Sequence, residues 1–121
     1  MSKLETSIQN KIRLAVARLA TMFRNNVGLF TTDRGSKVRT GLCKGSSDLI
    51  GWTEILVTPS MVGQKIAVFT AIEVKTPTGK VSKDQKNFND TVRASGGISG
   101  VARSPEDAVK IIENYRTNSN D

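Results

Sequence analysis

The chain has 121 residues with 18 Lys+Arg, 11 Asp+Glu, no His and one Cys, which gives a formal net charge of +7. A lone Cys43 excludes an internal disulfide, and the absence of His excludes histidine-based catalysis and any ordinary structural zinc site. If the chain is an enzyme, carboxylates and lysines must therefore carry its chemistry. Its length suits one modest hydrophobic core, so we expect a single domain over 1–121.

No stretch of the sequence approaches the ~18 uninterrupted apolar residues that a membrane span needs. Three basic residues interrupt the segment in which a signal peptide would need an apolar run: Lys11, Arg13 and Arg18. We therefore expect a cytoplasmic protein that has no membrane partner.

The first half of the chain predicts one helix and two strands. Ser2 and Glu5 form a capping-box pattern, and apolar residues at helical spacing predict a helix over about 3–25. The β-prone segment 27–32 predicts a strand, and the glycine-containing segment 33–45 is expected to be a mobile loop. A second strand is expected over 48–57.

The second half predicts a strand over 65–75 that is apolar on both faces, as central strands are. Ser82 is a suitable cap for a helix over 83–95, and a short strand follows over 98–103. A final helix opens at Ser104, and residues 117–121 are expected to fray. The order α-β-β-β-α-β-α predicts an α/β fold with a mixed central sheet flanked by helices.

The positive charge is uneven along the chain. Residues 1–93 hold 15 Lys+Arg against 7 acids, whereas residues 94–121 hold 3 against 4. Four bases with no acid among them fall in one short stretch: Arg34, Lys37, Arg39 and Lys44. This distribution favours binding to a phosphate backbone. The alternative is a solvated basic surface that aids solubility.

Glu73 and Lys75 are two residues apart on a predicted strand, so their side chains leave the same face. Opposite charges at the end of an apolar strand are costly unless they have a use. Asp48 begins the preceding predicted strand, and antiparallel pairing of that strand with the Glu73 strand could bring Asp48 beside Glu73, where a divalent cation would relieve the repulsion of two carboxylates. The alternative for Glu73 and Lys75 is a plain surface pair.

Magnesium suits such a site because it takes oxygen ligands and keeps several waters. The backbone carbonyl of Val74 is a further candidate ligand, and Lys75 could orient an attacking hydroxide or stabilise charge in the transition state. Together these groups are the parts of metal-dependent phosphodiester hydrolysis.

Five motifs in order make the sequence resemble the VRR-NUC domain, a branch of the PD-(D/E)XK nuclease superfamily. They are Gly45-Ser46-Ser47-Asp48-Leu49-Ile50-Gly51, Ile72-Glu73-Val74-Lys75, Gly79-Lys80-Val81-Ser82 with Gln85, Gly96-Gly97, and Val101-Ala102-Arg103. The resemblance covers about residues 5–112 and implies an αβββαβ core with a C-terminal helix. The sequence departs from the family at Ser47, where a proline is common, and at Ala102, where the family has an arginine.

The resemblance implies metal ligands at Asp48, Glu73, the Val74 carbonyl and Glu5, and catalytic roles at Asp48, Glu73, Lys75 and Gln85. Glu5 and Gln85 also have a second interpretation, as capping-box partners of Ser2 and Ser82. The candidate nucleic-acid contacts are Arg24, Asn26, Arg34, Lys37, Arg39, Lys44, Lys80, Lys83, Lys86 and Arg103.

The resemblance also implies an activity and a partner. It implies a Mg²⁺- or Mn²⁺-dependent DNA endonuclease that cuts branched DNA, such as four-way (Holliday) junctions or flaps. Stand-alone members of this size resemble phage-encoded proteins that form homodimers in the host cytoplasm. The alternatives are a structure-indifferent DNA nuclease, an RNA-directed nuclease, and a non-catalytic nucleic-acid-binding module with a nuclease-like fold.

Overall fold

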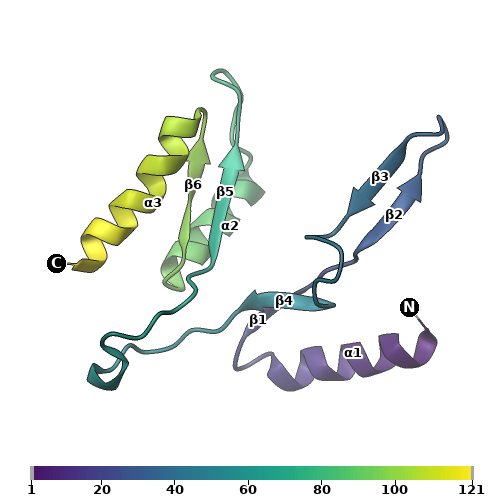
Figure 1. The fold of residues 1–121 in the computed structure, drawn as a ribbon, viewed down its shortest axis with the longest axis horizontal. Coiled ribbons are helices and arrows are strands. Elements are labelled where there is room, and N and C mark those ends of the chain that lie inside the picture. Colours follow the sequence, from purple (N-terminus) through teal and green to yellow (C-terminus); the bar gives the residue numbers. More distant parts are fainter. Residues whose placement is uncertain (1, 121) are drawn as a thin grey trace. The chain divides into compact units, whose positions relative to one another are not determined.

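The computed structural model describes the backbone of residues 2–120 and the side chains of residues 2–116. Its described elements are three α-helices, one 3-10 turn and six short strands, so the predicted α/β class is confirmed. The chain divides into two compact units, Met1–Ile55 and Leu56–Asp121 (Figure 1). Among the described residues, no helix is long and apolar enough to cross a membrane.

The first helix, α1 (Lys3–Val16), is capped by the Ser2 hydroxyl, which accepts the Glu5 amide at 3.1 Å. The prediction that this helix extends to about residue 25 is wrong. The chain turns after α1 and forms β1 (Thr21–Arg24), which pairs antiparallel with β4 (Leu49–Trp52).

Cross-strand contacts explain why β1 replaces the last turns of the predicted helix. The register pairs Thr21 with Trp52 and Phe23 with Ile50, and the rings of Phe23 and Trp52 lie with their centroids 5.6 Å apart. An aromatic pair of this kind contributes about 0.5–1.5 kcal/mol of stability beyond the contribution of the apolar area that it buries. A continued helix could not make this contact, so a long-range pairing overrides the local helical spacing.

The predicted loop over 33–45 is also partly wrong. Its middle forms β3 (Lys37–Thr40), which pairs antiparallel with β2 (Gly28–Thr31) in a hairpin. The turn is closed by the Thr32 amide, which donates to the Ser36 carbonyl at 2.7 Å. Gly35 lies in the turn at φ 81°, a left-handed conformation that glycine adopts without strain.

The two strands expected in the middle of the chain are shorter than predicted. The segment 48–57 yields only β4, and the segment 65–75 yields only β5 (Thr70–Val74). A short 3-10 turn over Pro59–Met61 lies between them. The first residue of β5, Thr70, pairs with Ile98, the first residue of the neighbouring strand. The length of that neighbour therefore sets where β5 starts.

The C-terminal unit is a β-α-β arrangement with one added helix. Strand β5 pairs in parallel with β6 (Ile98–Ala102), and α2 (Lys83–Ala94) connects them, as the sequence predicts. The last helix is α3 (Pro105–Asn120), which includes most of the tail that was expected to fray. Asp121 lies outside the described residues.

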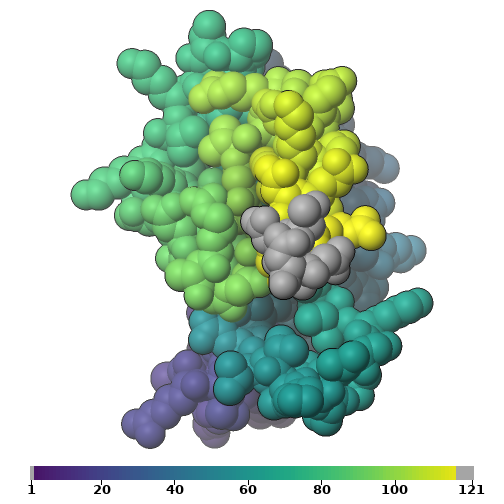
Figure 2. Space-filling view, turned by 90° about the vertical axis from the view of Figure 1, so that its left-hand side faces the viewer, coloured from purple at the N-terminus to yellow at the C-terminus, as the bar shows by residue number. Residues whose placement is uncertain are grey.

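Helices α2 and α3 cover opposite faces of the β5–β6 pair (Figure 1). On one face the Ser99 hydroxyl lies 2.7 Å from the side-chain oxygen of Asn89 in α2. On the other face a Cβ added at Gly100 would lie 2.8 Å from Ile111 of α3, so this helix packs closely on the strand. Figure 2 shows α3, in yellow, on the surface of this unit beside the green residues that precede it in the chain.

The described strands form three two-stranded sheets, of which one is parallel and two are antiparallel. The fold is therefore mixed α/β. The expected pairing of the Asp48 strand with the Glu73 strand joins the two units, and it stays a prediction, as does the single domain over 1–121.

Candidate active site

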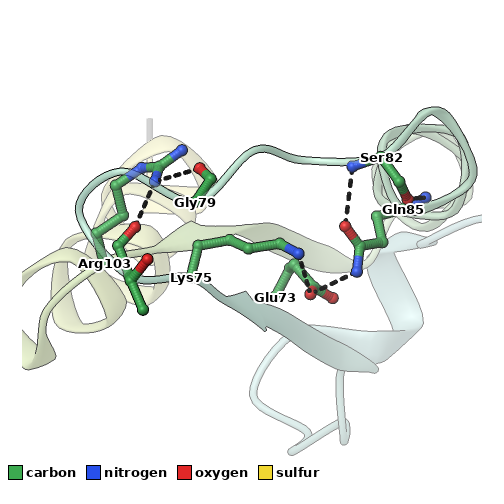
Figure 3. A network of polar contacts seen from close by, with 7 residues as sticks. Glu73, Lys75, Gly79, Ser82, Gln85 and Arg103 are labelled. Atoms are coloured by element: carbon green, nitrogen blue, oxygen red, sulfur yellow. Dashed lines mark hydrogen bonds and ion pairs between the residues drawn. The ribbon is translucent and has the colours of Figure 1, made fainter.

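Three polar side chains meet on one face of the C-terminal unit (Figure 3). Glu73 and Lys75 leave the same face of the β5 segment, and Gln85 reaches them from the first turn of α2. Gln85 Nε2 donates to Glu73 Oε1 at 2.8 Å, and Lys75 Nζ lies 3.6 Å from the same oxygen. The second carboxylate oxygen, Oε2, takes part in neither contact.

The cluster is half-buried, with 30% of the Glu73 side chain and 21% of the Lys75 side chain exposed to solvent. A charged pair this exposed contributes little to stability. The arrangement nevertheless fixes one carboxylate oxygen and leaves the other open to a ligand. The two-residue spacing in the sequence predicts the shared face of Glu73 and Lys75, and the structure has it.

Gln85 makes the predicted capping contact and also contacts Glu73, and its catalytic role stays a prediction. The Gln85 side-chain Oε1 accepts the Ser82 backbone amide at 2.9 Å. The Gln85 backbone amide donates to the Ser82 hydroxyl at 3.1 Å, and the two bonds complete a capping box. Because Oε1 faces a donor, the NH₂ group must be the part that faces Glu73. Capping therefore fixes the orientation in which Gln85 holds the Glu73 carboxylate.

The backbone of β5 makes the Val74 carbonyl available. The Lys75 amide donates to the Ala102 carbonyl at 3.0 Å, and the Ile98 amide donates to the Phe69 carbonyl at 2.9 Å. These bonds point the backbone groups of alternate residues, including Phe69 and Lys75, toward β6. Val74 lies between such residues and points its carbonyl to the other edge. Among the described strands of this unit, none pairs with that edge.

The N-terminal unit brings Glu5 and Asp48 to one pocket of about 170 Å³. Its lining also includes Gln9 and three apolar residues, Ile8, Ile12 and Leu49. Glu5 uses its backbone amide to cap α1, and its side chain lines the pocket. The contact with Ser2 is one half of the predicted capping box, and the metal role of the Glu5 carboxylate stays a prediction.

Gln9 is a site residue that the sequence reasoning missed. It is 6% exposed and lines the pocket with Glu5 and Asp48. Burial of a polar amide is costly unless it has a partner, and Gln9 shares its pocket with two residues that carry carboxylates. The available signal was the four-residue spacing from Glu5, which places both side chains on one face of α1.

Asn25 is a second residue that the sequence reasoning missed. Its Nδ2 donates to Ser46 Oγ at 2.7 Å and to the Ser47 carbonyl at 2.9 Å. Its Oδ1 accepts the Leu42 amide, and its backbone amide donates to the Asp48 carbonyl at 2.8 Å. One side chain thus holds the segment that leads into Asp48. Asparagine commonly satisfies loop backbone groups in this way.

These oxygen donors fit a hard divalent cation. Carboxylates and backbone carbonyls are the ligands that Mg²⁺ and Mn²⁺ accept, and the Glu73 Oε2 atom and the Val74 carbonyl are unused by the contacts above. Within the part of the chain that the structure describes, no group of three or more His, Cys, Asp or Glu converges. Asp48 and Glu73 belong to different units, so their union in one metal centre stays a prediction.

Nine of the ten predicted nucleic-acid contacts fall into three places. Arg34, Lys37 and Arg39 lie on the β2–β3 hairpin, and Lys44 lies in the segment after it. Lys80, Lys83 and Lys86 are exposed at the start of α2, where a helix dipole disfavours cations. Near β1, Arg24 Nη2 donates to Asn10 Oδ1 at 2.7 Å, and the Asn26 carbonyl accepts the Thr40 hydroxyl.

Arg103 has intramolecular partners. Its Nη1 donates to the carbonyl oxygens of Thr76 at 2.6 Å and Gly79 at 2.7 Å. The other guanidinium nitrogens take part in neither bond. The predicted phosphate contact of Arg103 therefore competes with a role inside the protein.

Comparison with known proteins agrees with the resemblance in the sequence. The family model described as the VRR-NUC domain matches residues 7–106, a range that contains Asp48, Glu73, Lys75 and Gln85. The searches of curated proteins and of solved structures found no match. The match covers most of the chain and includes all of the polar cluster on β5 and α2. The chain therefore belongs to the VRR-NUC domain family, and its function is that of a nuclease.

Proposed function

We propose that the chain is a divalent-metal-dependent DNA endonuclease centred on Asp48, Glu73 and Lys75. The observation that carries the proposal is the contact between Gln85 and Glu73, in which one carboxylate oxygen is held by an amide and a lysine while the other is left open. A surface ion pair needs no such third partner. A ligand-binding carboxylate does, because its orientation decides where the ligand sits.

Asp48, Glu73 and the Val74 carbonyl would hold Mg²⁺ or Mn²⁺, with Glu5 beside Asp48 as a further acid. A metal bound there supplies an acidified water and positive charge for the phosphate. Gln85 keeps the Glu73 carboxylate in one orientation. Lys75, whose ammonium group lies beside Glu73, offers positive charge and N–H donors to the attacking oxygen or to the phosphate.

Two groups of bases support a nucleic-acid substrate. Lys80 precedes α2 and Lys83 and Lys86 lie in its first turns, the part of the helix from which Gln85 contacts Glu73. Cations at the positive end of a helix are unfavourable unless anions offset them; Asp84 in the first turn supplies one negative charge, and a bound phosphate would supply more. The cations of the β2–β3 hairpin form a separate basic group in the N-terminal unit, and a two-stranded ribbon is a shape that a DNA major groove admits.

We further propose branched DNA, such as four-way junctions or flaps, as the preferred substrate of a homodimer. The resemblance to small phage-encoded members supports this choice. A two-fold pair of one-site protomers also matches the symmetry of a four-way junction. Sedimentation of the full chain at working concentration is expected to give a dimer. A monomer that still cleaves junctions symmetrically would contradict this assembly.

The experiment compares cleavage of a labelled four-way junction, a flap and a linear duplex of the same sequence. Each is incubated with Mg²⁺, with Mn²⁺ or with chelator, using the wild type and Lys75→Ala. We expect metal-dependent nicking of the junction that Lys75→Ala abolishes. Equal cutting of every DNA would favour a structure-indifferent nuclease, and tight binding without cutting would favour a binding module. A matching RNA duplex tests the RNA-directed alternative, because backbone contacts distinguish the two sugars poorly.

A further inference from the structure

Arg103, the residue that follows β6, holds the turn that follows Lys75 (Figure 3). The turn Thr76–Gly79 is closed by the Gly79 amide, which donates to the Thr76 carbonyl at 3.1 Å. Arg103 Nη1 donates to the carbonyls at both ends of this turn, at 2.6 and 2.7 Å. A single nitrogen thus joins the two ends of the turn to the end of β6.

Arg103 is itself held in place by the start of α3. Its backbone amide donates to Asp107 Oδ2 at 2.9 Å, and the Asp107 amide donates to the Ser104 hydroxyl at 3.1 Å. The residue before it, Ala102, accepts the Lys75 amide in the sheet. The guanidinium therefore starts from a fixed backbone, which lowers the entropy cost of its contacts with the turn.

The turn leads directly to the site. From Gly79 the chain continues to Ser82, the cap of α2, and one helical turn later Gln85 reaches Glu73. The path of residues 76–81 sets where the first turn of α2 lies over the strand. Hydrogen bonds from a charged donor are stronger than neutral ones, so Arg103 is the strongest restraint on this path that the described contacts provide.

We propose that Arg103 is a positioning residue, which fixes the Thr76–Gly79 turn and thereby keeps Lys75 and Gln85 aligned with Glu73. This inference rests on the proposed nuclease function for its catalytic consequence. It also assigns the arginine a role other than the phosphate contact that its place in the sequence suggests. The two roles differ in what substitution changes: a positioning residue alters the turn, whereas a phosphate contact alters DNA affinity and its salt dependence.

The test uses Arg103→Ala and Arg103→Lys, with Arg116→Ala as a matched control on exposed α3 surface. Lysine keeps the charge but lacks the reach and fork of a guanidinium. Amide hydrogen exchange of residues 76–82 is measured on the full chain without DNA. Single-turnover cleavage at saturating DNA, and DNA affinity across salt concentrations, are measured in parallel. Protection of the buried Val92 amide serves as the check that each variant is folded.

We expect both Arg103 variants to speed exchange of the Gly79 amide about tenfold and to slow saturated cleavage by a similar factor. We expect DNA affinity and its salt dependence to match those of the wild type, and Arg116→Ala to change none of these quantities. The proposal would be overturned if the Arg103 variants exchanged residues 76–82 at the wild-type rate, if Arg103→Ala reduced the slope of log DNA affinity against log salt by about one, and if Arg103→Lys restored DNA binding. A wild type that does not cleave refutes the proposed function, while the exchange measurement still decides the role of Arg103.

Discussion

Gln85 makes two contacts that substitutions can separate. Its Oε1 accepts the Ser82 amide, and its Nε2 donates to Glu73. Gln85→Glu keeps an acceptor for the cap and replaces the donor with a second carboxylate oxygen. Ser82→Ala does the reverse, because it removes the capping hydroxyl and leaves the Ser82 amide and the Glu73 contact in place.

The magnitudes follow from the two bonds. Loss of an N-cap hydroxyl costs about 1 kcal/mol of stability, so Ser82→Ala is expected to lower the free energy of unfolding by that amount. A hydrogen bond to a charged group contributes about 1.5–3 kcal/mol. Because 30% of the Glu73 side chain is exposed, the lower end applies, which corresponds to about a tenfold loss of cleavage rate in Gln85→Glu.

The assay is single-turnover cleavage at saturating protein, combined with urea unfolding of the same samples. Gln85→Glu is expected to be about ten times slower and also less stable by at least about 1.5 kcal/mol, because the lost bond to Glu73 is replaced by two facing carboxylates. Ser82→Ala is expected to be less stable but within about twofold of the wild-type rate. If Gln85→Glu cleaves as fast as the wild type, the contact with Glu73 has no catalytic importance and Gln85 is only a helix cap.

Two further predictions concern other parts of the molecule. Asn89→Ala removes the buried partner of Ser99 and is expected to lower the free energy of unfolding, measured by urea titration, by about 1–3 kcal/mol. The control Asn87→Ala, at an exposed position of the same helix, is expected to change it by less than about 0.5 kcal/mol. Equal effects of the two would refute a role for the buried bond. A double variant that replaces the hairpin residues Lys37 and Arg39 with Ala is expected to reduce the slope of log DNA affinity against log salt by about two. An unchanged slope would show that DNA does not bind at the hairpin.

The parts of the fold that the sequence predicted correctly are those in which local signals agree. Helix α2 carries its own cap, and its predicted range 83–95 differs from the observed Lys83–Ala94 by one residue. Strand β6 and the start of α3 follow glycine and proline signals of the same kind. The shared face of Glu73 and Lys75 required only the two-residue period of a strand.

The errors lie where distant residues decide the structure. The helical spacing continues through Phe23, but pairing of β1 with β4 ends the helix at Val16. The hairpin β2–β3 depends on a turn at Gly35 in a segment whose charges and glycines suggested a loop. The partners of the Asn25 and Arg103 side chains lie at least 17 residues away, so no local pattern could identify them.

The central claim is that Asp48 and Glu73 serve one metal centre. Its most direct test is titration of the full chain with Mn²⁺, in which binding is measured from the spectroscopic signal of the free ion. The proteins compared are the wild type, Asp48→Asn, Glu73→Gln and the exposed-acid control Glu54→Gln. We predict that each site variant loses at least about tenfold in affinity and that the control binds as the wild type does. Asp48→Asn binding Mn²⁺ as tightly as the wild type, while Glu73→Gln loses it, would contradict the shared centre.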